Sequence, residues 1–190
     1  MFKTKDELLA SIGIEEAGLS TEACDTLKKM NVSTLAQMIK LEKRDFNPEV
    51  SNNIIEEIVQ TSFEIELKPA YALDKDFTLP EEYTALVAEV VDEFTLPKNM
   101  INQYVSIGYY ENCEKGIDAV IKSLYSHETT RKLLKKRIVD TIQELNSKCD
   151  LSKLRELLPP HLTNASIVYD IIRDLCYEHK LLITGVELIK

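Results

Sequence analysis

The chain has 190 residues, of which 44% are hydrophobic and 29% are charged, so it is long enough to bury a core in one domain or in two small ones. Its formal net charge of −9 argues against a general nucleic-acid binder, because such proteins gain most of their affinity from Lys and Arg side chains that neutralise phosphates. The first residues are charged and no apolar run approaches the roughly 20 residues of a membrane-spanning helix, so we expect a cytoplasmic protein with no membrane contact.

The first predicted domain covers residues 1–67 and consists of short helices. Thr34 and Gln37 have the spacing of a capping box, in which each side chain satisfies a free N–H group at a helix start. Asn47-Pro48-Glu49 predicts a later helix start, because Asn caps, Pro fits the first helical position and Glu complements the positive end of the helix dipole. The expected buried stripe of that last helix comprises Ile54, Ile55, Ile58 and Phe63.

The stretch from Gly18 to Ile39 reads GLSTEACDTLKKMNVSTLAQMI. It resembles the C-terminal domain of the bacterial RNA polymerase alpha subunit. That family opens with Gly/Glu-Leu-Thr/Ser, followed by a helix ending in Leu-Lys, a short turn, and a helix with the pattern Ile/Val-x-Thr-Leu-x-x-Leu/Met-Ile. The match runs from about Ile12 to Leu67. The resemblance implies a helix-hairpin-helix fold and a role in transcription.

The residues with which this family holds promoter DNA differ here. The family uses an Arg and an Asn on its first core helix, where this chain has Glu22 and Asp25, and a Leu-Gly-Lys-Lys-Ser turn, where this chain has residues 50–54, VSNNI. An acid repels the DNA backbone, and loss of the turn's glycine removes the close approach of backbone N–H groups to a phosphate. We therefore expect this domain to contact a protein, with DNA binding doubtful. The candidate contact residues are Glu22, Asp25, Lys28, Ser51, Asn52 and Asn53.

Residues 68–77 contain Pro69 and lack helical periodicity, so they are predicted to be a linker. A second helical domain is expected at residues 78–190. Thr78-Leu79-Pro80 and Thr95-Leu96-Pro97 are two similar helix openings, each followed by apolar residues at helical spacing. Two further helices are predicted from stripes that comprise Ile117, Val120, Ile121 and Leu124, and Leu134, Ile138, Ile142 and Leu145.

The end of the chain, after a polar break at residues 146–150, has a different pattern. A short helix at residues 151–158 is stopped by Pro159-Pro160, and a longer one is predicted at residues 167–176. Val186 and Leu188 then alternate with polar or small residues, which predicts a short strand. This order resembles a winged-helix ending near residues 164–190. A helical bundle with a terminal strand or strap is the alternative.

No catalytic constellation is present in the sequence. There are only five glycines and no phosphate-cradling or metalloprotease motif. The four cysteines form no C-x-x-C pair and none stands at metal-ligand spacing from a histidine, which favours reduced thiols without a metal. We therefore expect no catalytic site, no cofactor and no metal.

The run from Arg131 to Arg137 is the one dense basic cluster. On a helix, Lys132, Lys135 and Lys136 share a side, and this stripe could meet phosphates or an acidic protein surface; a solvated helix face is the alternative. Its cationic residues are Arg131, Lys132, Lys135, Lys136 and Arg137.

Together these patterns predict a mainly α, non-enzymatic protein of bacterial or phage transcription that contacts RNA polymerase or a regulator. One alternative is a DNA-binding regulator that uses the basic helix at residues 131–137 or a winged helix near residues 164–190. A second is a replication accessory protein, since residues 94–102, FTLPKNMIN, resemble helicase-loader domains of Gram-positive primosomes.

Overall fold

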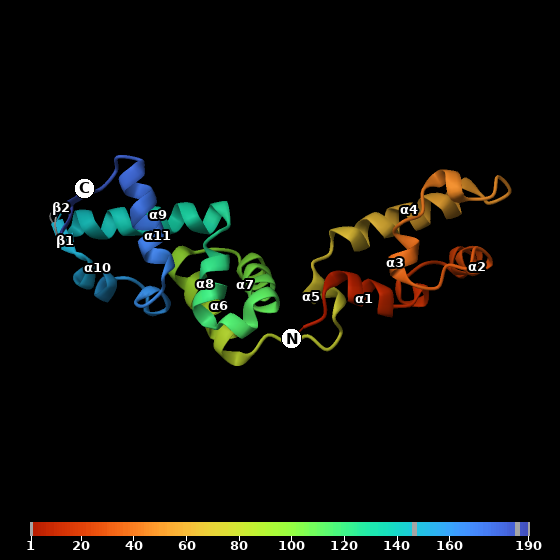
Figure 1. Ribbon diagram of the computed structural model, residues 1–190, viewed down its shortest axis with the longest axis horizontal. Coiled ribbons are helices and arrows are strands. Elements are labelled where there is room, and N and C mark those ends of the chain that lie inside the picture. The colour runs from red at the N-terminus through yellow and green to blue at the C-terminus, as the bar shows by residue number, and fades with distance from the viewer. Residues whose placement is uncertain (1, 146–147, 185–186, 190) are drawn as a thin grey trace. The chain divides into compact units, whose positions relative to one another are not determined.

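The computed structural model describes residues 2–145, 148–184 and 187–189 (Figure 1). It is mainly helical, which confirms the predicted fold class. The chain divides into two compact units, one at residues 2–77 and one from residue 78 onward.

The first unit contains five α-helices and two 3-10 turns. The helices are α1 (Lys5–Ser11), α2 (Thr21–Lys29), α3 (Leu35–Met38), α4 (Asn52–Leu67) and α5 (Ala70–Leu73), and the turns are Ile14–Glu16 and Lys43–Asp45. Each of the five helices buries at least one apolar side chain, and α1, α2, α3 and α5 are too short to be stable in water without tertiary packing. The buried side chains include Leu9, Ile14, Leu27, Leu35, Met38, Phe46, Ile58 and Ile65.

The capping box at the start of α3 is confirmed. Thr34 Oγ1 accepts a hydrogen bond from the Gln37 N–H at 3.4 Å, and Gln37 Oε1 accepts one from the Thr34 N–H at 3.3 Å. Backbone bonds from Leu35 N–H to the Ile12 carbonyl and from Ile14 N–H to the Ser33 carbonyl fix this helix start against the segment before α2.

The predicted start of α4 at Asn47-Pro48-Glu49 is wrong. Asn47 Oδ1 accepts the Glu49 N–H at 3.0 Å, and the Val50 N–H donates to the Asn47 carbonyl at 2.9 Å, so this segment closes a turn of its own. Ser51 caps the helix instead, accepting the Ile54 N–H at 3.4 Å. The turn therefore lies directly before the helix, and residues 52–54 are already part of α4.

The expected buried stripe of α4 is partly wrong. Ile58 is fully buried, but Phe63 is 55% exposed, and Ile54 and Ile55 are only half-buried. The buried positions are Ile58, Ser62 and Ile65, whose spacing of four and three residues fits one face of a helix.

Residues 68–77 are a packed part of the first unit and not a free linker. α5 lies within this segment and packs against α1, with Leu73 buried. The Phe77 ring contacts the rings of Phe2 and Tyr71, with centroids 5.7 and 5.4 Å apart. The division of the chain thus follows Phe77.

The second unit begins with α6 (Glu81–Phe94), α7 (Lys98–Asn112) and α8 (Ile117–Leu124), which pack side by side (Figure 1). Both Thr-Leu-Pro openings are confirmed, because Pro80 and Pro97 directly precede α6 and α7. α9 (Glu128–Glu144), α10 (Leu151–Leu157) and α11 (Ile167–Tyr177) follow, with 3-10 turns at Cys113–Lys115 and Pro160–Leu162. A single apolar core joins all six helices.

A three-stranded antiparallel sheet closes this unit. Strands β1 (Lys148–Asp150), β2 (Leu182–Thr184) and β3 (Glu187–Ile189) lie in the order β1-β3-β2, with Cys149 opposite Leu188 and Ile183 opposite Leu188. The predicted short C-terminal β element is confirmed, although Gly185 and Val186 lie outside the described residues. The elements follow one another in the chain order α9, β1, α10, α11, β2, β3, and the first strand pairs with the last.

A buried polar chain connects three segments of the second unit. The His161 side chain is only 3% exposed, and its Nδ1 lies 2.8 Å from Glu89 Oε1 while its Nε2 lies 2.7 Å from the Tyr125 hydroxyl. A carboxylate can only accept, so Nδ1 carries the proton and Nε2 accepts from Tyr125. Burial lowers the pKa of His161 more than Glu89 raises it, which keeps the ring neutral.

Candidate protein-interaction groove

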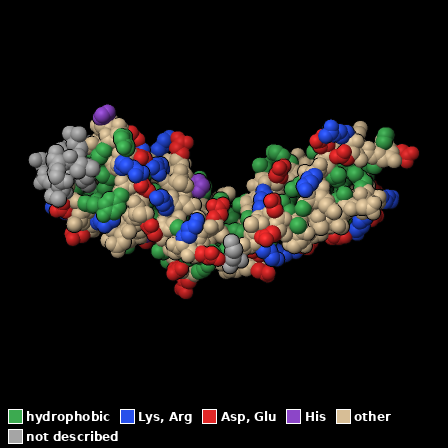
Figure 2. All heavy atoms as spheres, in the orientation of Figure 1, with side chains coloured by type: hydrophobic (Ala, Val, Ile, Leu, Met, Phe, Trp, Pro, Cys, Tyr) green, Lys and Arg blue, Asp and Glu red, His purple; other side chains and the backbone are tan. Residues whose placement is uncertain are grey.

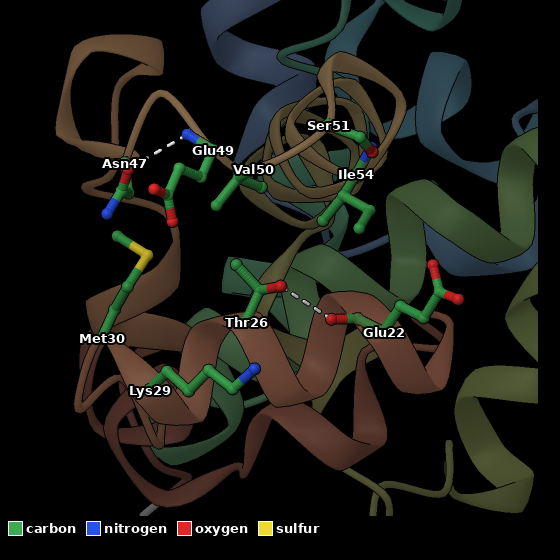
Figure 3. Close-up of a pocket in the computed structure, with 9 residues that line it drawn as sticks. All are labelled: Glu22, Thr26, Lys29, Met30, Asn47, Glu49, Val50, Ser51 and Ile54. Atoms are coloured by element: carbon green, nitrogen blue, oxygen red, sulfur yellow. Dashed lines mark hydrogen bonds between the residues drawn. The ribbon is translucent and has the colours of Figure 1, made fainter.

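A groove of about 610 Å³ lies in the first unit, between α2 and the turn that precedes α4 (Figure 3). This volume falls within the range typical of ligand pockets. Two of the predicted contact residues, Glu22 and Ser51, come together here from opposite walls. The lining consists of Glu22, Thr26, Lys29, Met30, Asn47, Glu49, Val50, Ser51 and Ile54.

Helical spacing determines which side chains of α2 reach the groove. Ala23 and Leu27 are fully buried in the core, so the residues at positions 22, 26 and 29 lie on an outward face of the same helix. Thr26 donates its hydroxyl proton to the Glu22 backbone carbonyl at 2.8 Å, and the Glu22 side chain is exposed.

A carboxylate bridge holds the two walls of the groove together. Glu57 of α4 accepts hydrogen bonds from both the backbone N–H and the hydroxyl of Ser20, at 2.6 and 2.8 Å. Ser20 is also the N-cap of α2, accepting the Ala23 N–H at 3.2 Å. The start of α2 is therefore tied to α4, and the separation of the groove walls is set by side chains outside the groove.

The groove carries two carboxylates that the rest of the unit does not neutralise. Glu22 and Glu49 lie at opposite ends of it, with Thr26, Val50 and Ile54 between them (Figure 3). Within residues 2–145, 148–184 and 187–189, neither carboxylate is engaged by an ion pair or hydrogen bond. The two groups are thus available to a cation from another molecule.

The other predicted residues of this unit lie outside the groove. Lys28 pairs with Glu15 at 3.1 Å, and that contact raises the pKa of Lys28. Asp25 is exposed on α2, and Asn52 and Asn53 are exposed in the first turn of α4, but none of them lines the groove. The lining residues missed from the sequence include Lys29 and Glu49. Thr26 and Lys29 could have been found as the i+4 and i+7 neighbours of Glu22.

The basic run on α9 is largely used within the second unit. Arg131 Nη2 lies 2.5 Å from Asp174 Oδ2, and Lys135 pairs with both Asp174 and Glu178, so these cations tie α9 to α11. Lys135 lowers the pKa of Glu178 to about 2, with a smaller effect of Lys180.

The remaining basic residues of α9 have different environments. Arg137 Nε lies 2.8 Å from Glu93 Oε1 of α6, and Lys132 pairs with Glu128 one turn away. Lys136 is exposed and has no ion-pair partner among the described residues. Of the stripe predicted for Lys132, Lys135 and Lys136, the first two are therefore used in ion pairs within the described residues. On the face shown in Figure 2, basic and acidic side chains are interspersed.

The outer face of α11 is aromatic and not basic. Tyr169 and Tyr177 are 50% and 78% exposed, and the Arg155 guanidinium lies 4.5 Å from the centre of the Tyr169 ring. Asp170 pairs with Lys122 and with Arg173, and the first of these contacts contributes most to lowering its pKa. Phosphate-binding cations are therefore sparse on this helix.

Neither a metal cluster nor a membrane span is found in the part of the chain that the structure describes. It contains no group of three or more His, Cys, Asp or Glu residues arranged to hold a metal ion. Within the same ranges, no helix combines the length and apolar character needed to cross a bilayer.

Comparison of the chain with protein-family models, with curated proteins and with solved structures finds no match.

Proposed function

We propose that this chain is a non-enzymatic protein of bacterial or phage transcription whose first unit contacts a protein, RNA polymerase or a regulator, and not promoter DNA. Two features support the proposal: the likeness of residues 12–67 to the C-terminal domain of the polymerase alpha subunit, and the negative charge of the first unit. Residues 2–77 contain fifteen acidic and nine basic residues, so the whole unit repels a phosphate backbone.

The observation that carries the proposal is the position of Glu22. By the resemblance, it takes the place of the family's DNA-contacting Arg, and it lines a groove together with Glu49 and the capped start of α4. The groove thus offers a concave surface to another macromolecule, and its two carboxylates disfavour DNA as that macromolecule.

Restoring the family's residues tests this proposal. Glu22→Arg combined with Asp25→Asn should give the chain a salt-dependent affinity for an AT-rich duplex, whereas the unaltered chain should show no saturable binding at ~0.15 M salt. Glu66→Arg reverses one charge at the far end of α4, as Glu22→Arg does in the groove, and should gain nothing. In parallel, purified bacterial RNA polymerase should be retained by the unaltered chain. Micromolar DNA binding by the unaltered chain that is abolished by changes at Ser51, Asn52 or Asn53 would contradict the proposal.

The order of elements from α9 to β3 favours direct DNA binding by a winged helix as a second candidate function. Helix α11 would be the helix presented to the major groove. Its exposed Tyr169 and Tyr177 and its paired Asp170 weaken this candidate. Replacing Arg173, which is 64% exposed, and Lys136 by Gln would lower duplex affinity in proportion to the lost phosphate contacts if this function holds.

A further inference from the structure

We infer that the groove between α2 and α4 binds a partner segment that carries cationic side chains on both sides of an apolar one. This inference rests on the proposed function, because it specifies the chemistry of the partner that the first unit contacts. It follows from the distribution of charge and apolar surface along the groove.

The two ends of the groove select cations. Glu22 and Glu49 contribute two negative charges, Lys29 contributes one positive charge, and the N-terminal end of α4 adds about half a positive charge. The sum of these charges is negative. Because both carboxylates only accept hydrogen bonds, they fit the planar, donor-rich guanidinium of Arg better than any neutral group.

The middle of the groove selects an apolar side chain. Val50 and Ile54 lie on one wall, and Met30 extends from the other (Figure 3). Methionine has an unbranched and polarisable side chain that adapts to ligands of different shape. The aliphatic stems of Arg or Lys can cover the same surface on their way to the carboxylates.

The groove does not need to form when the partner arrives. The Glu57–Ser20 bridge and the Ser51 cap use residues whose polar groups are already bonded within the unit. A preformed site loses little conformational entropy on binding, so a short segment can bind measurably.

Two peptides test the inference on the isotopically labelled full-length chain. The probe is the acetylated and amidated heptapeptide Ala-Arg-Ala-Leu-Ala-Arg-Ala, and its control replaces both Arg residues by Gln. The Arg peptide should shift the backbone NMR signals of Met30, Val50 and Ile54 saturably. The affinity of the Gln peptide should be at least about tenfold lower, as expected for lost charge-assisted hydrogen bonds. Equal binding of both peptides, or no saturable shift in the groove, would overturn the inference.

Matched variants connect the signal to the carboxylates. Glu22→Gln with Glu49→Gln should weaken the Arg peptide about tenfold, whereas Glu66→Gln, at the other end of α4, should leave its affinity unchanged. An unaltered circular dichroism spectrum verifies that the double variant is folded. An unchanged affinity in the folded double variant overturns the inference.

The same variants separate this inference from the proposed function. If RNA polymerase is retained by the unaltered chain and lost with the double variant, both stand. If polymerase is retained equally by the double variant, the groove is not the contact and the inference falls while the protein-contact function remains. If the Arg peptide binds in the groove but neither polymerase nor a regulator does, the inference stands and the transcription function is contradicted.

Discussion

His161 shows how one buried side chain makes the stability of a unit depend on pH. Its lowered pKa means that the folded state binds a proton less readily than the unfolded chain, whose His pKa is about 6.5. The stabilising contribution is therefore complete at neutral pH and is lost as the pH falls below that value toward the folded pKa. The groups that face the ring are Glu89, Glu93 and Tyr125.

We expect the thermal midpoint of the second unit to decrease as the pH is lowered from 7 to 5. His161→Gln should reduce the slope of the midpoint against pH. The variant should also lose about 1–3 kcal/mol at pH 7, because the Tyr125 hydroxyl is left buried with a poorer partner. His127 has a pKa lowered by burial and should supply the slope that remains. The control is His179→Asn, since Asn tolerates the positive φ of 56° at that position. A His161 variant with the full slope would refute this assignment.

At the scale of elements, the two Thr-Leu-Pro openings provide a matched pair for a stability test. Thr95 ends α6 with φ 52° and ψ 47°, in the left-handed region that a β-branched residue rarely occupies. Thr78 has no positive φ. Thr95→Asn should therefore raise the free energy of unfolding by about 0.5–1 kcal/mol, while Thr78→Asn should have little effect. Urea denaturation measures the free energy of unfolding of both variants. An equal change in the two would contradict backbone strain at Thr95.

The elements also show which features the sequence could predict. Pro80, Pro97 and the Thr34 box act within three or four residues, so their helix starts were predicted correctly. The start of α4 was not, because both Asn47 and Ser51 can cap and the choice depends on how the turn packs. The pairing of Arg131 with Asp174 spans 43 residues, and only the fold brings the two together.

The groove was predictable in part for the same reason. The family resemblance drew attention to Glu22 and Ser51, and both line it. The sequence pattern predicts Glu49 to be a helix-start residue, and nothing local in the sequence shows that it lines a groove with α2. The tie between Ser20 and Glu57, which sets the width of the groove, is likewise a contact between distant residues.

At the scale of the whole molecule, the division after Phe77 predicts which fragments fold. A fragment of residues 1–77 should unfold cooperatively, whereas residues 1–67 alone should be less stable by at least about 2 kcal/mol, because they lose the burial of Leu73 and the Phe77 ring contacts. Calorimetry of the two fragments measures this difference. Leu73→Ala in the longer fragment should reproduce part of this loss of stability. Equal stability of both fragments would show that the first unit ends at residue 67.

The strand order β1-β3-β2 has a consequence for folding during synthesis. The central strand, β3, is the last of the three to leave the ribosome. β1 and β2 each pair with β3 and not with each other. The sheet can therefore close only after residue 189 has emerged. By then the first unit has long been free of the exit tunnel, so we expect the nascent chain to carry a folded first unit and an open edge at β1 until β3 has left the tunnel.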